Sequence, residues 1–123
     1  MIDGAKAFSG FSVNNLETAR DFYQNKLQLK VTDGEMELLE LHIAGGSPII
    51  IYPKENHQPA TFTILNFPVD NIEKTVDQLS SRGITFDRYP SFDHDGKGIV
   101  RSKGGPSIAW FKDPAGNILS IIQ

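Results

Sequence analysis

The sequence predicts an α+β fold in which one unit, a strand followed by a helix and three strands, occurs twice in 123 residues. The first observation is an internal repeat: FSVNNLETARDFYQ, starting at Phe11, is built like FPVDNIEKTVDQLS, starting at Phe67. The second is a change inside each copy from an apolar strand to helical periodicity. The third is a set of three strand-like runs after each helix.

The start of each helix carries a polar residue with a glutamate three positions later. Asn14 and Glu17 form this pair in the first copy, and Asp70 and Glu73 form it in the second. Such a pair is typical of a capping box, in which the two side chains bond the free amides of the first turn. We therefore expect one amphipathic helix after each of these pairs.

The ends of the two helices are predicted to differ. Gly83 supplies a helix stop in the second copy, whereas Gln28 stands near the corresponding place of the first. The strands expected after the helices are 29–32, 36–43 and 48–52 in the first half, and 84–89, 107–112 and 118–123 in the second. The last two are joined by the turn DPAGN, in which Pro114 and Gly116 suit a tight hairpin.

The organisation predicted from these elements is a single domain of two modules. Module 1 covers about 1–53 and module 2 about 61–123, and the polar, proline-containing segment of about 54–60 is the expected linker.

The composition excludes several classes of function. The net charge of −3 argues against a nucleic-acid binder, and the absence of cysteine excludes disulfides and thiolate metal sites. The chain shows no secretory signal pattern and no apolar run of the ~20 residues that a membrane span requires. We expect a cytoplasmic protein that engages neither membrane nor nucleic acid.

The helix pattern NLETARDFY and the hairpin FKDPAGN together resemble the glyoxalase, bleomycin-resistance and extradiol-dioxygenase superfamily, also called vicinal oxygen chelate proteins. The likeness covers nearly the whole chain. It departs from the family where Asn15 and Asn71 replace acidic residues and where Gln28 replaces a glycine. The resemblance implies paired βαβββ modules whose curved mixed sheets form a cup with the helices outside, and a homodimer that holds a small molecule in the cup.

The resemblance also implies where a catalytic member would hold a divalent metal. The family's ligand positions fall on Phe8, Ile64 and Ser120, with a fourth near Ile51. Hydrocarbon side chains cannot coordinate a cation, and a neutral hydroxyl is a poor ligand beside carboxylate or imidazole. We therefore expect no metal and no cofactor.

Two polar side chains are candidates for a ligand site. Glu40 and His42 alternate along one strand with leucines, so they share one face. They either face the cup, where they could orient a ligand, or form a solvent-facing edge.

The other two histidines are weaker candidates. His57 lies in the polar linker and is expected at the surface. His94 lies between Asp93 and Asp95, where a cation could bind, although such a glycine-rich stretch is more often a turn.

The segment 91–106 is rich in glycine and carries Lys97, Arg101 and Lys103. A long segment with little regular structure is often functional, so a lid role is plausible, with Arg101 pairing with an anionic ligand group. A solvated loop or a dimer contact explains it equally well.

Aromatic and aliphatic residues complete the predicted ligand site. Most will lie in the core, but a cup lined by a few of them would suit planar or aliphatic molecules. The candidate ligand-binding residues are Phe8, Glu40, His42, Tyr52, Ile64, Arg101, Trp110 and Ser120.

Three functions remain open. The favoured one is a metal-free protein that sequesters an apolar or aromatic small molecule. The alternative is a lyase, isomerase or dioxygenase that holds Zn, Ni, Mn or Fe through non-standard ligands such as Glu40, His42 and His94. The third is a structural or partner-binding module. Whether the protein is an enzyme is left open by the sequence.

Overall fold

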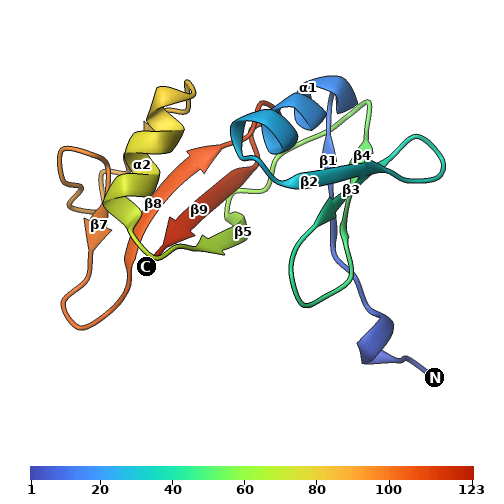
Figure 1. Ribbon diagram of the computed structural model, residues 1–123, viewed down its shortest axis with the longest axis horizontal. Helices are drawn as coiled ribbons and strands as arrows, with labels where there is room; N and C mark the ends of the chain where they lie inside the picture. The colour runs from blue at the N-terminus through green and yellow to red at the C-terminus, as the bar shows by residue number, and fades with distance from the viewer. The chain divides into compact units, whose positions relative to one another are not determined.

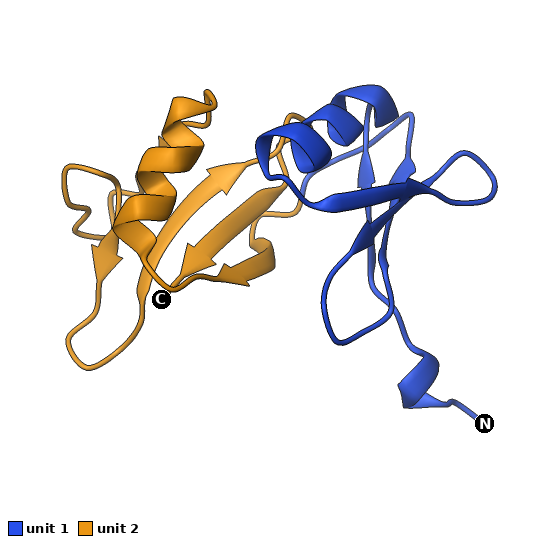
Figure 2. Cartoon of the chain, viewed as in Figure 1, with its two compact units in different colours: residues 1–59 blue, residues 60–123 orange.

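The computed structural model describes residues 1–123, which divide into two compact units, 1–59 and 60–123 (Figure 2). Each unit contains one sheet with both parallel and antiparallel pairs and one main helix. The predicted α+β class and the twofold strand, helix and three-strand order are confirmed.

The first unit is a four-stranded sheet of order β1-β4-β3-β2 (Figure 1). β1 pairs with β4 in parallel, and β3 pairs antiparallel with both β4 and β2. Its elements are η1 (Gly4–Lys6), β1 (Gly10–Val13), α1 (Leu16–Asp21), η2 (Phe22–Lys26), β2 (Lys30–Asp33), β3 (Leu39–His42) and β4 (Ile49–Pro53).

The second unit repeats this topology with the order β5-β9-β8-β6. β5 pairs with β9 in parallel, and β8 pairs antiparallel with β9, β6 and a short extra strand, β7. Its elements are β5 (Thr63–Pro68), α2 (Ile72–Ser81), β6 (Phe86–Asp87), β7 (Val100–Arg101), β8 (Ser107–Lys112) and β9 (Ile118–Ile122).

Both helices are capped by asparagine, one residue later than the sequence pattern predicted. The Asn15 side chain accepts a hydrogen bond from the Thr18 amide, and the Asn71 side chain accepts one from the Lys74 amide. The predicted capping boxes that start at Asn14 and Asp70 are therefore wrong in register. The two asparagines, which stand where the family that the sequence resembles has acidic residues, are therefore the caps themselves.

The two helices end more alike than expected. Gly83 has a φ of 88° and Gln28 a φ of 57°, so both residues adopt the left-handed conformation. The first helix reaches Gln28 through the π-helical turn η2, in which the Leu27 amide bonds the Phe22 carbonyl. The expected difference in the endings therefore lies in the π-helical turn of the first helix, whereas a left-handed residue after the helix is common to both.

Each unit has its own core between its helix and one face of its sheet. In the first unit the rings of Phe11 and Tyr23 lie 5.9 Å apart, which places Tyr23 against the sheet. The buried apolar residues there include Val13, Ala19, Phe22, Tyr23, Leu39, Leu41 and Ile51, and in the second unit Ile72, Val76, Leu79, Ala109, Phe111, Leu119 and Ile121.

Some strand boundaries differ from the predictions. The run 36–43 becomes a strand only from Leu39, because Met36 and Glu37 have φ values of 59° and 57° and form a turn. The run 84–89 pairs only at Phe86–Asp87. The segment 91–106 holds β7 and an isolated bridge between His94 and Val100, so it is more regular than expected.

The DPAGN hairpin between β8 and β9 forms as predicted. Buried Asp113 accepts hydrogen bonds from the amides of Ala115 and Asn117, and its second oxygen accepts from the Asn117 side chain. Gly116 has a φ of 86°, which suits glycine. These bonds fix the register in which β9 returns along β8. No helix in the structure has the length and apolar character to cross a membrane.

Candidate functional site

The second sheet has a face that points away from α2, which we call the distal face. Along β8 and β9 the buried residues Ala109, Phe111, Leu119 and Ile121 alternate with residues of opposite orientation. Trp110 and Ser120 belong to the alternate set and lie directly opposite each other in the ladder. The distal face therefore presents an indole ring and a hydroxyl side by side.

Two hydrogen bonds hold these side chains in place. The Trp110 indole N–H donates to Thr63 Oγ1 over 3.1 Å, and the Ser120 hydroxyl donates to Asn66 Oδ1. Both acceptors belong to β5, which pairs with β9. Ser120 is fully buried, whereas Asn66 is exposed. The edge strand thus orients the polar atoms of the distal face.

Trp110 belongs to an aromatic cluster. Its other members are Tyr89, Phe92 and His94. The Phe92 ring stacks on the indole with 5.3 Å between centroids, and the Tyr89 ring meets the indole edge-on at 5.5 Å. The His94 ring lies 6.2 Å from the indole. Phe92 remains 48% exposed. The cluster is a partly solvated aromatic surface, suited to flat apolar molecules.

His94 anchors the segment that carries the cluster. Its Nε2 accepts a hydrogen bond from the Tyr89 amide at 2.9 Å, and its Nδ1 lies 2.8 Å from the Gly98 carbonyl oxygen. A carbonyl can only accept, so Nδ1 carries the proton and the ring is neutral in this arrangement. Both nitrogens are occupied, which leaves His94 no lone pair for a metal.

One polar atom in the cluster has no partner. The Tyr89 hydroxyl is buried and makes no hydrogen bond in the structure. A buried polar group without a partner is uncommon and costs about 1–3 kcal/mol.

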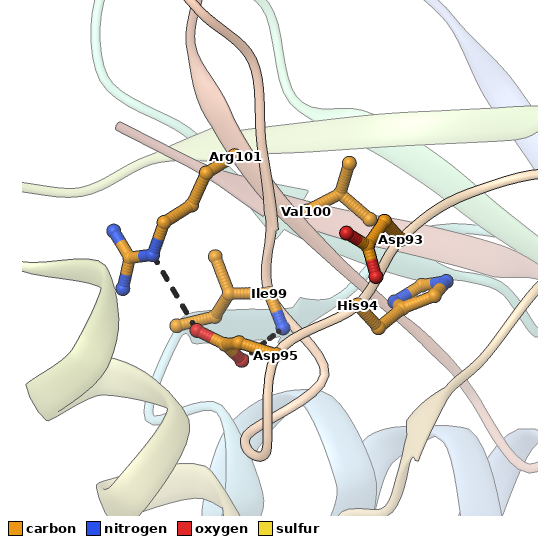
Figure 3. Close-up of a pocket in the computed structure, with 6 residues that line it drawn as sticks. All are labelled: Asp93, His94, Asp95, Ile99, Val100 and Arg101. Atoms are coloured by element: carbon orange, nitrogen blue, oxygen red, sulfur yellow. Dashed lines mark hydrogen bonds and ion pairs between the residues drawn. The ribbon is translucent and has the colours of Figure 1, made fainter.

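A pocket of about 330 Å³ opens beside His94, and Figure 3 shows the residues that line it: Asp93, His94, Asp95, Ile99, Val100 and Arg101. The Arg101 guanidinium pairs with Asp95 at 3.4 Å and with Glu73 of α2. Lys97 pairs with Asp77 on the same helix. Arg101 and Lys97 are therefore held by acidic partners beside α2.

Asp95 is engaged by backbone amides of its own loop as well as by Arg101. One of its oxygens accepts the amides of Lys97 and Ile99, both at 2.9 Å. Burial alone would raise the pKa of Asp95, but the Ile99 and Lys97 amides and the Arg101 charge outweigh it and hold the pKa below its ordinary value. The hypothesis of a cation between Asp93 and Asp95 gains no support, because no three His, Asp or Glu side chains are placed to hold a metal.

In the first unit, Glu40 and His42 share the face opposite to buried Leu39 and Leu41, as expected. The Thr32 hydroxyl lies 2.7 Å from His42 Nε2 and 3.3 Å from Glu40 Oε1. The pair is thus joined through a threonine of β2. Tyr52, 40% exposed, lies on the neighbouring strand β4.

The positions where the family's metal ligands fall do not offer a donor set. Phe8 is 67% exposed and precedes β1, and Ile64 is half-buried at an irregularity of β5. The only oxygen in the set, on Ser120, is bonded to Asn66. The side chains present do not fit a divalent metal.

The fourth position, expected near Ile51, falls on Ile50 when it is located by strand pairing. Asn66 pairs with Ser120, and its repeat equivalent Gly10 pairs with Ile50. Ile50 is therefore the counterpart of Ser120, whereas Ile51 is fully buried on the core side. Because Ile50 is also a hydrocarbon, the correction leaves the donor set unchanged.

Sequence reasoning missed four residues of the distal face: Thr63, Asn66, Tyr89 and Phe92. Asn66 precedes an obvious core residue, Phe67, so alternation could have indicated Asn66. Thr63 carried no such signal, because plain alternation places it with Leu65 and Phe67, and only the irregularity of β5 between Thr63 and Leu65 changes its side. Tyr89 and Phe92 gave no such signal, because they lie in an irregular segment. His57 was expected at the surface but is half-buried and bonded to Ser12.

The comparisons with known proteins point to one family. The sequence profile described as Glyoxalase/Bleomycin resistance protein/Dioxygenase superfamily matches residues 8–121. No curated protein matches the chain.

Solved structures with the same fold include three relatives of low identity. FosX, a fosfomycin resistance protein from Listeria monocytogenes, has a TM-score of 0.73 at 17% identity, covering 99% of this chain and 93% of that chain. TnmS3, an antibiotic binding protein from a Streptomyces species, has a TM-score of 0.67 at 20% identity, and the match covers 98% of this chain and 97% of TnmS3. A superfamily member from Sphaerobacter thermophilus has a TM-score of 0.69 at 20% identity, and the match covers 94% of this chain and 95% of that chain.

Proposed function

Because the chain belongs to the Glyoxalase/Bleomycin resistance protein/Dioxygenase superfamily, we propose that it binds and sequesters an apolar or aromatic small molecule without a metal ion. The observation that carries the proposal is the aromatic cluster on the distal face. A stacked and an edge-on ring already surround the indole of Trp110, and Thr63 fixes its orientation. A flat guest would extend this packing.

The chemistry of the site also indicates the polar features of the guest. The side-chain carbonyl of Asn66 accepts from Ser120, and the residue is exposed, so its amide group could donate to a guest. The Tyr89 hydroxyl is unpartnered. A planar molecule with an oxygen or nitrogen acceptor at its edge would satisfy these donors, which gives orientation to an otherwise apolar contact.

The relatives make this class of function plausible. One relative is an antibiotic binding protein and another a fosfomycin resistance protein. Binding a small molecule tightly enough to remove it from solution requires no reacting group. The alternative of a metal-dependent lyase, isomerase or dioxygenase lacks a donor set, since His94 has both nitrogens engaged and Phe8 and Ile64 are hydrocarbons.

The test uses the single tryptophan as its own reporter. Naphthol, quinoline and an anthraquinone sulfonate are titrated into the protein while Trp110 fluorescence and the melting temperature are followed. We expect saturable quenching by at least one planar compound and a rise in melting temperature with its excess over Kd. A saturated fatty acid of similar size, which cannot stack, should quench less.

Variants then locate the site. Trp110→Ala should weaken binding about tenfold, the value of a good aromatic contact, when binding is followed by calorimetry. Met36→Ala, which removes an exposed apolar side chain of the first unit, is the control and should bind normally. Equal loss in both variants would contradict a site on the distal face. Elemental analysis that finds one divalent ion per chain would contradict the metal-free part of the proposal.

A further inference from the structure

A serine and a histidine of the first unit form a direct side-chain pair. Ser12 Oγ lies 2.6 Å from His57 Nδ1, although 45 residues separate them in the chain. Both side chains are half-buried. The pair belongs to the first unit, whereas the proposed binding site is built from residues of the second, and nothing in that function uses the pair.

The backbone on both sides holds the pair in position. Ser12 is a residue of β1 that pairs with Tyr52 of β4. Just beyond β4, the Lys54 amide bonds the Val13 carbonyl at 2.9 Å, which continues the β1–β4 pairing into the linker. The His57 amide then bonds the Lys54 carbonyl and closes a turn. These two backbone hydrogen bonds therefore hold His57 close to β1.

This geometry has the two elements of an activated hydroxyl. When Ser12 is the donor, Nδ1 is the unprotonated nitrogen of His57 and Nε2 carries the hydrogen. A neutral imidazole at hydrogen-bond distance can take the serine proton as the oxygen attacks an electrophile. We propose that Ser12 and His57 act as nucleophile and general base in acyl transfer from esters of small carboxylic acids.

The neighbouring side chains indicate the kind of ester. Tyr52 stands opposite Ser12 in the β1–β4 pairing, so its ring lies on the same side of the sheet, and it is 40% exposed. Ile50, two residues before Tyr52, shares that side and is half-buried. An aromatic and an aliphatic side chain next to the hydroxyl favour an ester whose alcohol is a phenol.

The reaction is an ordinary displacement at a carbonyl carbon. The Ser12 oxygen forms a bond to the acyl carbon while His57 Nδ1 takes its proton, and the bond from that carbon to the phenol oxygen breaks. The phenolate leaves with the proton from His57. Water, deprotonated by the same imidazole, then attacks the acyl-serine and restores the Ser12 hydroxyl, with the carboxylic acid as second product.

The experiment treats the full-length protein with p-nitrophenyl acetate. We expect a burst of nitrophenolate and a peptide containing Ser12 that is heavier by one acetyl group in mass spectrometry. His57→Gln should slow acetylation of Ser12 on the order of 100-fold, and Ser12→Ala should abolish the adduct. Ser12→Cys keeps a nucleophile in place and should form the thioester.

Two controls make the result decisive. Ser9→Ala removes an exposed serine just before β1, and Glu55→Gln changes an exposed side chain of the same linker; both should react like the parent protein. Melting curves identify any variant that fails to fold, in which case His57→Gln and Ser12→Cys still report. Acetylation at a histidine or lysine in place of Ser12, or an undiminished burst in Ser12→Ala, would overturn the proposal. Neither result bears on binding at the distal face.

Discussion

Ser120 of β9 lies directly opposite Trp110 of β8, and its hydroxyl donates to Asn66 of β5. The residue at the family's last metal-ligand position is therefore fully buried and already bonded within the sheet. Trp110 is bonded in the same way to Thr63 of β5. The distal face is fixed by neutral hydrogen bonds across three strands, where a metal enzyme of this family would need a carboxylate.

Restoring that carboxylate should not restore a metal site. Ser120→Glu would bury a charge with no cationic partner, and Phe8 and Ile64 still offer no ligand. We expect the free energy of unfolding to fall by at least about 2 kcal/mol in denaturant titrations. Metal content after dialysis against Zn²⁺ should stay at the parent level.

Ser120→Ala is the matched control, because it removes the bond to Asn66 without adding charge. It should cost about 1 kcal/mol, since Asn66 is exposed and can bond water. A Ser120→Glu protein of parental stability that carries one zinc ion per chain would show that the ligand positions have been assigned incorrectly.

The repeat made most of the fold predictable. The change from alternating to helical periodicity after Phe11 and Phe67, and the hairpin at Asp113, report local backbone preferences that the structure preserves. Burial of alternate residues along 107–112 follows from the same period. These signals come from neighbouring residues, so one sequence suffices to read them.

The site was less predictable because its contacts join residues distant in sequence. Three such bonds depend on strand register: Ser12 with His57, Trp110 with Thr63, and Ser120 with Asn66. The hydrophobic pattern shows which face of the sheet a side chain occupies, but not which residue of the next strand lies beside it. The placement of Phe92 on the indole depends on the path of an irregular segment. Trp110 and Ser120 could be selected, but the residues of β5 to which each one is hydrogen-bonded could not be predicted.

The position of the helix caps can be tested by paired substitutions. Asn15→Ala and Asn71→Ala each remove a side-chain acceptor of a first-turn amide and should lower the free energy of unfolding by about 1 kcal/mol. Asn14→Ala and Asp70→Ala, one residue earlier, should have little effect. Chemical denaturation of the four variants gives the comparison. Larger losses at Asn14 and Asp70 would instead support the capping boxes predicted from the sequence.

Substitutions of the left-handed residues after the two helices should change the stability of the protein in opposite directions. Gln28 has a φ of 57°, which disfavours any residue with a Cβ, so Gln28→Gly should stabilise the protein by roughly 0.5–1 kcal/mol. Gly83 has a φ of 88°, so Gly83→Ala should destabilise it by about 1 kcal/mol or more. Both values come from thermal or denaturant unfolding. A loss of stability in Gln28→Gly would mean that contacts of the glutamine side chain outweigh the backbone strain.

The contribution of Asp95 to stability should depend on pH. Its pKa is lower in the folded protein than the ordinary value of about 3.9, because the Ile99 and Lys97 amides and Arg101 favour the carboxylate over the penalty of burial. A lowered folded pKa means that ionised Asp95 stabilises the protein above pH 4 and that this stabilisation is lost as the pH falls through the folded pKa.

Asp95→Asn should therefore melt below the parent protein at pH 7, and the difference should shrink steadily on acidification from pH 5 and vanish once Asp95 is protonated. Because the carboxylate is partly solvated, we expect the difference at pH 7 to be no more than about 1 kcal/mol. Asp93→Asn, which changes an exposed neighbour, should differ little from the parent over the same range. If the difference in melting temperature between Asp95→Asn and the parent protein widened on acidification, the sign of the linkage would be reversed. That result would mean that the loop favours the protonated acid.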